Sequence, residues 1–229
     1  SQASKKAFIE AGGKADKVEI VYNGFDPQKY ISSETETQRI RKKLELEDKF
    51  IVGHFSRLAP WKGQHILIEA LAKCPPEVAV ILVGDALFGE QDYVKQLHQQ
   101  IDKLQLQNRI KFLGFRNDIP LLMSACNLVA HTSTSPEPFG RVIVEAMLSG
   151  TPVVAAAAGG AVELVESGIN GFLATPGNPQ ELTEIIKTCF QNKQKADTIA
   201  QEAQNSASQR FQVANINQQI AQLLKQLSM

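Results

Sequence analysis

Short, continuous apolar runs alternate along the chain with longer amphipathic stretches. Apolar runs of strand length occupy residues 18–24, 50–56, 78–84, 109–114, 127–133, 151–156 and 171–175. Apolar side chains recur at helical spacing over residues 63–74, 91–104, 119–125, 139–149 and 160–166. The run at 78–84 is almost entirely apolar, as expected for a strand buried on both faces. The repeated strand–helix–strand order predicts an α/β fold built on a doubly wound, Rossmann-like parallel sheet.

The two ends of the chain depart from this alternation. Residues 1–25 start without a methionine and inside a helical pattern, so we interpret them as the tail of a preceding domain and a crossover. Residues 26–210 are predicted to form the Rossmann-like domain. The polar, glutamine-rich end keeps apolar residues at helical spacing, so residues 211–229 are predicted to form a C-terminal helix that packs back on the body.

Composition narrows the class of protein. The chain has 229 residues, of which 43% are hydrophobic and 21% charged, as in soluble globular proteins. Lys+Arg and Asp+Glu both count 24, so no bulk basic field favours nucleic acid as a partner. No apolar run approaches the roughly 18 residues that a membrane span needs. Cys74, Cys126 and Cys189 are far apart and lack metal-ligand spacing, which favours buried thiols and a cytoplasmic location.

Polar and glycine-rich residues follow the predicted strands. The segments in question are Arg57 to Lys62, Asp85, Phe115-Arg116, the stretch SPEPFGR at 135–141, and Gly159-Gly160. Because ligands of open parallel sheets bind outside the carboxyl ends of the strands, these residues are predicted to share one binding rim.

The residue types on this rim favour a nucleoside diphosphate linked to a polar group. Arg57 offers a planar fork to phosphate oxygens and Lys62 a point charge. Phe139 and Gly140 stand where a helix begins, and the free N–H groups there attract anions. Arg141 is either a further phosphate contact or a rim residue.

Two glutamates frame that helix start. Glu137 and Glu145 are eight residues apart, which is roughly 12 Å of helical rise. That distance is about the span from a ribose to a sugar across a diphosphate. The spacing therefore predicts that the two carboxylates hold the two polyol ends of one ligand.

The stretch EPFGRVIVEAM, residues 137–147, resembles the E-x7-E motif of the retaining, group 1 glycosyltransferases of family 4, which have the two-Rossmann GT-B fold. The resemblance extends in order over nearly the whole chain, through VYNGFD, SRLAPWKG, LVGD, IKFLGF, GTPVVA and GGAVELVESGINGFL. It implies that the chain is the donor-binding half of an enzyme that transfers sugar from a nucleotide sugar. It also implies a missing N-terminal acceptor-binding domain, without which this fragment is inactive.

The same resemblance implies roles for individual residues. Arg57 and Lys62 would bind the diphosphate, Glu137 the donor sugar and Glu145 the ribose. Arg57, Lys62 and Glu137 would take part in catalysis. Donor contacts would also come from the base side and from the start of the helix, through Phe115, Phe139, Gly140, Arg141 and Val142. No cofactor or metal is implied, and association of the full-length enzyme with a membrane surface is left open.

Several alternatives stay open from the residues alone. The chain could be a non-catalytic nucleotide-sugar-binding module, or part of a sugar-nucleotide epimerase or phosphorylase of the same two-Rossmann plan. A dinucleotide oxidoreductase is disfavoured, because no G-x-G-x-x-G follows the first strand. The choice among UDP, GDP and ADP, the sugar and the acceptor are not fixed.

Individual side chains on the rim also have two interpretations. Asp85 is a turn residue or a ligand contact, and Glu163 either caps the helix that follows Gly159-Gly160 or faces the sugar. Trp61 is expected to pack the loop. Three histidines are expected to be structural: His54, His65 and His98. His131 ends a strand beside the site, and its contact with a ligand is open.

Overall fold

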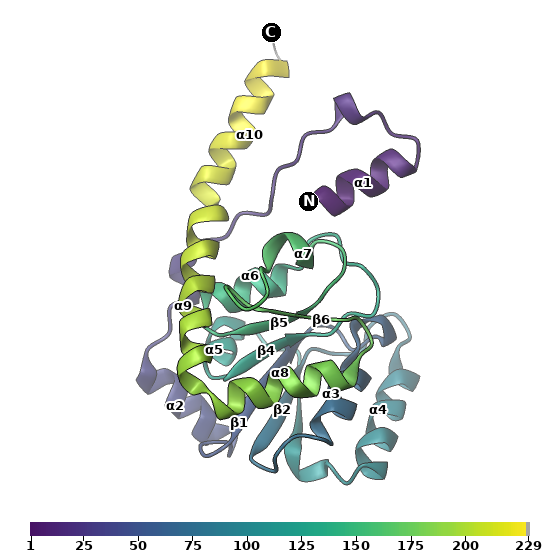
Figure 1. Ribbon diagram of the computed structural model, residues 1–229, viewed down its shortest axis with the longest axis vertical. Coiled ribbons are helices and arrows are strands. Elements are labelled where there is room, and N and C mark those ends of the chain that lie inside the picture. Colours follow the sequence, from purple (N-terminus) through teal and green to yellow (C-terminus); the bar gives the residue numbers. More distant parts are fainter. Residues whose placement is uncertain (228–229) are drawn as a thin grey trace.

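The computed structural model describes residues 1–227 and contains a six-stranded sheet in which every pair of neighbouring strands is parallel (Figure 1). The strands are β1 (Phe50–Phe55), β2 (Val78–Val83), β3 (Ile110–Gly114), β4 (Leu128–His131), β5 (Val153–Ala156) and β6 (Phe172–Ala174). Their order across the sheet is β3-β2-β1-β4-β5-β6. This confirms the predicted doubly wound, Rossmann-like sheet.

Helices cover both faces of the sheet. One face carries α3 (Gln64–Leu71), α4 (Gln91–Lys103) and α8 (Pro179–Gln191). The other face carries α2 (Glu34–Lys43), α5 (Ile119–Ser124), α6 (Arg141–Leu148), the short α7 (Ala161–Leu164) and most of α9 (Lys193–Arg210). Within residues 1–227, no helix is long and apolar enough to cross a membrane.

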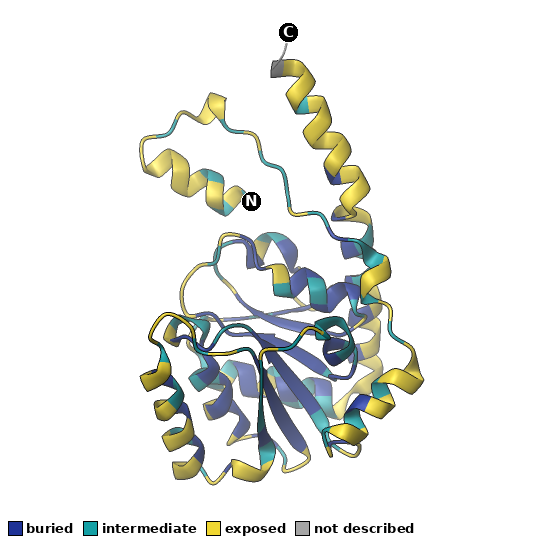
Figure 2. Ribbon diagram, turned by 180° about the vertical axis from the view of Figure 1, so that it is seen from behind, coloured by how far each residue is buried: buried dark blue, intermediate teal, exposed yellow. Residues whose placement is uncertain are grey.

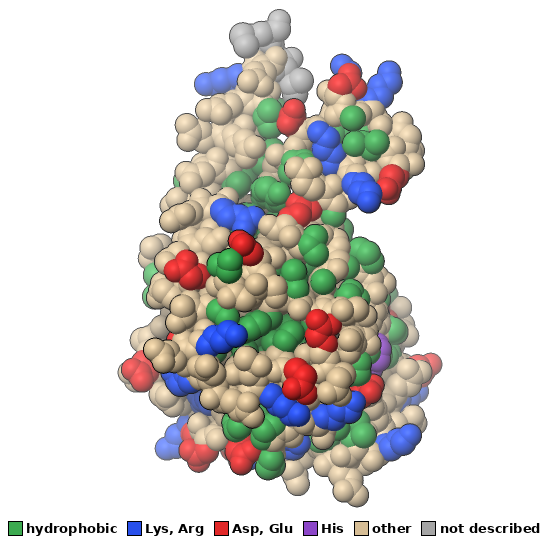
Figure 3. Space-filling view, in the orientation of Figure 1, with side chains coloured by type: hydrophobic (Ala, Val, Ile, Leu, Met, Phe, Trp, Pro, Cys, Tyr) green, Lys and Arg blue, Asp and Glu red, His purple; other side chains and the backbone are tan. Residues whose placement is uncertain are grey.

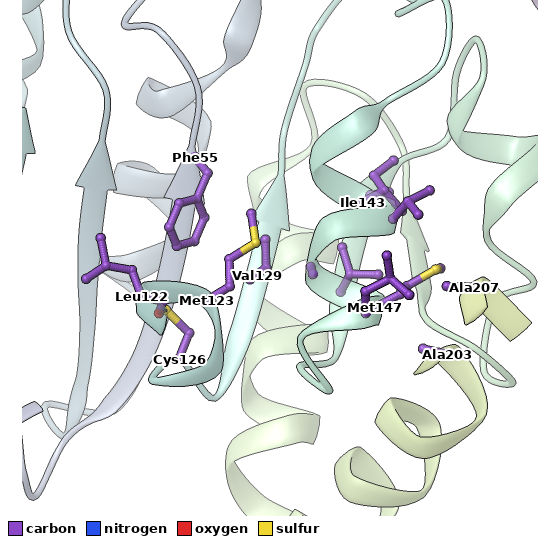
Figure 4. Packing of buried hydrophobic residues seen from close by; sticks show 14 of the residues in the cluster. Phe55, Leu122, Met123, Cys126, Val129, Ile143, Met147, Ala203 and Ala207 are labelled. Atoms are coloured by element: carbon purple, nitrogen blue, oxygen red, sulfur yellow. Dashed lines mark hydrogen bonds between the residues drawn. The ribbon is translucent and has the colours of Figure 1, made fainter. Parts of the chain in front are cut away.

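Each strand contributes side chains to two hydrophobic cores, one on each face of the sheet, because successive side chains point to opposite faces. Ile51 of β1 lies in the core under α5 and α6, whereas Val52 lies in the core under α3 and α4. Figure 4 shows the first of these cores, where Met147 of α6 lies toward Ala203 and Ala207 of α9. These alanines are fully buried, so their small side chains let the backbones of α6 and α9 approach closely.

The order of the strands creates the place where a ligand can bind. The chain leaves β1 toward β2 and β3, and later returns to β4 on the other side of β1. The loops that follow β1 and β4 therefore run in opposite directions and leave a crevice between them. The segment 56–63 forms one wall of this crevice and the segment 132–140 the other.

The two chain ends extend beyond the sheet (Figure 1). The helices α1 (Gln2–Glu10) and α10 (Val213–Leu227) are largely exposed (Figure 2). The strand expected at 18–24 is wrong: among residues 1–227, the only bridge near it joins Phe25 and Gln212. This segment lies outside the sheet, and no strand of the described residues lies beside it to pair with. The division into residues 1–25, 26–210 and 211–229 stays a prediction.

Short 3₁₀ turns complete the fold at Ala15–Lys17, Pro27–Tyr30, Pro60–Lys62 and Gln107–Arg109. Basic and acidic side chains are interspersed on the face shown in Figure 3, in keeping with the balanced charge of the sequence.

Candidate functional site

A cleft of about 720 Å³ opens at the carboxyl ends of β1 to β4. Its lining includes all nine residues that the sequence predicts for the site: Arg57, Lys62, Phe115, Glu137, Phe139, Gly140, Arg141, Val142 and Glu145. It also includes residues that the sequence did not single out for a ligand, among them Asn23, Ser56 and Ile119. The structure thus brings the predicted set together, while the role of each member stays a prediction.

Lys62 enters the cleft from the turn after β1. The next residue, Gly63, has φ +75°, and a β-carbon there would lie 2.0 Å from the carbonyl oxygen of Thr132. Only glycine allows this close approach, which packs the turn against the end of β4. The Nζ atom of Lys62 consequently lies 2.7 Å from Oε1 of Glu137, so an ion pair bridges the two walls.

Glu137 is held by more than this lysine. His131 Nε2 lies 2.9 Å from the same Oε1 atom, and the Ser133 hydroxyl also donates to it. Burial alone would raise the pKa of Glu137, but the hydrogen bonds from His131, Lys62 and Ser133 hold it well below its usual range. Glu137 is therefore an ionised carboxylate with only 12% of its side chain exposed.

Two consecutive glycines fix the backbone of Glu137. The N–H of Gly160 donates to the carbonyl oxygen of Glu137 over 2.8 Å. Gly159 has φ +60°, and a β-carbon there would lie 2.2 Å from that same oxygen. The Gly159-Gly160 pair that stood out in the sequence therefore lets the loop after β5 approach the loop after β4 closely.

Arg57 stands at the rim of the cleft. Its guanidinium lies between the rings of Trp61 and Phe88, 5.5 and 5.3 Å from their centroids, and 3.8 Å from Glu90. The buried Gln64 amide donates to the Arg57 carbonyl over 2.9 Å and fixes the backbone at this point. An anion that binds Arg57 has to compete with Glu90.

Helix α6 starts at the floor of the cleft. Its N-cap Gly140 has φ +94° and no side chain to accept hydrogen bonds, so the N–H groups of Arg141 and Val142 are left for solvent or a ligand, whereas that of Ile143 donates to the Gly140 carbonyl oxygen over 3.0 Å. Arg141 makes an ion pair with Glu145 at 3.3 Å and lies over the ring of Phe25 at 5.0 Å. Burial raises the pKa of Glu145, and burial followed by the charge of Glu145 raises the pKa of Tyr30 to about 12.

Other side chains that the sequence singled out have structural roles. Asp85 accepts the N–H of Phe115 over 2.9 Å and so fixes the end of β3. Glu163 does not cap its own helix, as one interpretation held, because α7 has no side-chain cap. Its carboxylate instead accepts the N–H groups of Gln2 and Ala3 at 2.8 Å each, at the start of α1. Glu163 thus ties α1 to the loop after β5.

Three histidines have the structural roles expected of them, and the fourth, His131, lies in the site. His54 is buried and bonds to the carbonyl of Lys62, and burial lowers its pKa to about 4. His65 bonds to Tyr93, and His98 stacks on Phe112. His131 contacts Glu137, a role that the sequence did not assign. Its signal was a lone polar side chain at the end of an otherwise apolar strand.

Within residues 1–227, no three His, Cys, Asp or Glu side chains are grouped so that they could hold a metal ion.

Comparison with known proteins places this geometry in a family. The crystal structure of Anabaena Alr3699/HepE in complex with UDP superposes with a TM-score of 0.98 at 66% identity, over 99% of this chain and 62% of that chain. The same protein is also known in complex with UDP-glucose. A C-terminal domain of a group 1 glycosyl transferase (LpcC) from Francisella tularensis superposes with a TM-score of 0.76 at 28% identity, over 83% of this chain and 100% of that chain.

Comparison of the amino-acid sequence leads to the same family as comparison of the structure. Spore coat protein SA of Bacillus subtilis (strain 168) is 32% identical over 209 residues, which are 85% of this chain and 55% of that protein. The chain thus spans about half the length of the curated relatives that it matches, and its fold corresponds to one half of the GT-B plan. The model of the family described as glycosyl transferases group 1 matches residues 36–206. The chain therefore belongs to the group 1 glycosyl transferases.

Proposed function

We propose that this chain is the donor-binding half of a retaining, metal-independent glycosyltransferase that transfers a sugar from a nucleotide sugar to an acceptor. The observation that carries the proposal is the cleft at the ends of β1 to β4, where cationic side chains, two carboxylates and the start of α6 face one space. A nucleotide sugar needs this combination, because it places two negative charges between two polyols.

The expected contacts follow the cleft from one end to the other. Phe115, which is 73% exposed, borders the base, and Glu145 accepts hydrogen bonds from the ribose. Arg57, Lys62 and the N–H groups at the start of α6 bind the diphosphate. Glu137 accepts hydrogen bonds from the transferred sugar.

These groups would stabilise the negative charge that develops during the reaction. When the bond between the sugar and the diphosphate breaks, negative charge builds up on the departing phosphate. The side chains of Arg57 and Lys62 and the N-terminus of α6 oppose that charge, without the need for a metal ion. The ionised Glu137 holds the sugar while the acceptor's hydroxyl oxygen forms the new bond to the anomeric carbon and its proton passes to the departing phosphate oxygen.

We propose UDP-glucose as the donor to test first. The Anabaena protein, 66% identical to this chain, is known in complex with UDP and with UDP-glucose. The acceptor site is assigned to an upstream domain, with residues 1–25 as the end of that domain and its crossover, and this half is not expected to turn over alone. The three buried free thiols favour a cytoplasmic location.

Calorimetric titration of this chain tests the donor assignment. UDP, GDP and ADP and their glucose forms are titrated in the presence and absence of EDTA. We expect UDP and UDP-glucose to bind with a Kd in the micromolar to millimolar range, since only half of the cleft is present. Loss of binding in EDTA would contradict metal independence, and absence of binding by every ligand would contradict the donor site.

A non-catalytic nucleotide-sugar-binding module would pass the same titration. Product analysis separates it from the enzyme, with the longer protein, UDP-glucose and a panel of acceptors. Sugar transfer with retained anomeric configuration is the expected result. Binding without any transfer or hydrolysis would favour the binding module.

A further inference from the structure

Glu137 uses its two carboxylate oxygens unequally. All three hydrogen bonds to its side chain, from Lys62, His131 and Ser133, end on Oε1. Among residues 1–227, Oε2 has no hydrogen-bond partner. Since Glu137 lines the cleft, Oε2 is the atom that it can offer to a ligand.

One of these three hydrogen-bond donors to Glu137 is also proposed to contact the ligand. Lys62 pairs with Glu137 at 2.7 Å, and under the proposed function its ammonium also binds the diphosphate. A nucleotide sugar brings two phosphate charges, and these attract the ammonium of Lys62 more strongly than the single carboxylate of Glu137 does. When Lys62 turns toward the phosphates, Oε1 depends on His131 and Ser133 alone.

His131 is suited to hold Oε1 without help. It ends β4, in register with Ala155 of β5, and only 4% of its side chain is exposed. His131 also lines a narrow gap of about 10 Å³ beside Ile66, Val154 and Leu182. An imidazole ring does not fit into so small a gap, so the ring has little freedom to turn away from Glu137.

The state of the ring agrees with this role. Within the described residues, Nδ1 of His131 is buried and has no hydrogen-bond partner. A buried N–H without an acceptor is costly, so the neutral ring places its proton on Nε2. That proton points at Oε1 of Glu137, 2.9 Å away.

We propose that His131 is a positioning residue for recognition of the donor sugar. Its Nε2–H holds Oε1 of Glu137 in place, so that Oε2 stays available to the sugar while Lys62 binds the diphosphate. The inference rests on the proposed function, and it adds that the sugar contact depends on a residue that does not touch the ligand.

Titrations of UDP and UDP-glucose into this chain test the inference. His131→Leu removes the N–H group that donates to Glu137, whereas His131→Gln keeps an N–H group at nearly the same place. We expect His131→Leu to weaken UDP-glucose about tenfold, the effect of losing a hydrogen bond to a charged group, and to leave UDP within about twofold. His131→Gln should retain most of the affinity for UDP-glucose.

The matched control is His65→Leu. His65 is half-buried and bonds to Tyr93 at 2.9 Å, and it does not line the cleft. His65→Leu makes the same substitution at a histidine that also bonds to another side chain but lies outside the cleft. The ratio of UDP to UDP-glucose affinity should not change.

The outcomes separate this inference from the proposed function. If Glu137→Gln weakens UDP-glucose and His131→Leu does not, or if His131→Leu weakens both ligands equally, the positioning role is overturned and the donor site stands. If Glu137→Gln leaves UDP-glucose unchanged, the assignment of Glu137 to the sugar and this inference both fail, while the donor site stands. If wild type binds none of the nucleotides or their glucose forms, the donor site and this inference fail together.

A spectroscopic measurement does not depend on the folding of any variant. The nitrogen chemical shifts of His131 in wild type report which ring nitrogen carries the proton. We expect the Nε2–H form, and the Nδ1–H form would overturn the inference.

Discussion

The ammonium of Lys62 lies 2.7 Å from a carboxylate oxygen of Glu137, although the two residues are 75 positions apart in the sequence. The pair joins the loop after β1 to the loop after β4, across the point where the strand order reverses. In this structure each charge neutralises the other. A phosphate ligand therefore competes with Glu137 for Lys62, and this competition shapes the first prediction.

Glu137→Gln is expected to separate the two ligands. Loss of the charged acceptor should weaken UDP-glucose about tenfold to a hundredfold, since hydrogen bonds to charged groups contribute about 1.5–3 kcal/mol. Bare UDP should bind as well as before or more tightly, because Lys62 is released from its carboxylate partner. Calorimetric titration of both ligands measures the difference. Equal weakening of UDP and UDP-glucose would contradict the assignment of Glu137 to the sugar.

Glu145→Gln is expected to weaken both ligands, because the ribose that it is proposed to contact belongs to both. The expected loss is again about tenfold to a hundredfold for each. Arg141, which pairs with Glu145 at 3.3 Å, keeps a neutral partner in this variant. The melting temperature should stay within a few degrees of wild type. An effect confined to UDP-glucose would place Glu145 on the sugar instead.

Gly159→Ala is expected to destabilise the protein much more than Gly177→Ala. Both glycines have positive φ, +60° and +75°, so a β-carbon strains the backbone at each, by about 1–2 kcal/mol. Only at Gly159 would the new atom also collide with Glu137, 2.2 Å from its carbonyl oxygen, while nothing lies within 4 Å at Gly177. Urea unfolding should show a further loss of at least about 2 kcal/mol for Gly159→Ala. Similar losses for both variants would show that the loop can move aside.

His54 makes the stability depend on pH. Burial lowers its pKa to about 4, below the ordinary value of 6.5, so the unfolded chain binds a proton between these values and the folded chain does not. The free energy of unfolding should therefore fall as the pH drops from about 6.5 to 4, by about 3 kcal/mol from this group. Denaturant unfolding at several pH values measures the slope. His54→Gln should flatten it, and an unchanged slope would exclude His54 as its cause.

The sequence was informative where burial leaves a pattern. The apolar run at 78–84 is β2, and the cations that follow the strands, Arg57, Lys62 and Arg116, do line one cleft. Asp85 and the Gly159-Gly160 pair were expected on the same rim but do not line this cleft. The run at 18–24 has the same local pattern but no strand to pair with, and this depends on the tertiary structure. Helix α2 was missed because its only buried residue is Ile40, although Ser33 and Glu36 form a capping box at its start.

The contacts within the site were harder to predict than its members. Whether Lys62 meets Glu137 depends on β1 and β4 being neighbours, and that follows from the strand order rather than from any local pattern. The role of His131 depends in turn on the rotamer of Glu137. A sequence shows which residues follow the strands, but not which side chains then meet.

Glu163 gives the short segment 159–163 a double attachment. At one end Gly160 donates to the backbone of Glu137, and at the other the carboxylate of Glu163 accepts the first N–H groups of α1. If α1 swings relative to the sheet, it must either release that carboxylate or pull on the segment that fixes Glu137. The position of α1 is thereby linked to the backbone of Glu137 through residues 159–163, and the Ser1 hydroxyl at the start of α1 also donates to the carbonyl oxygen of Pro138, the residue after Glu137.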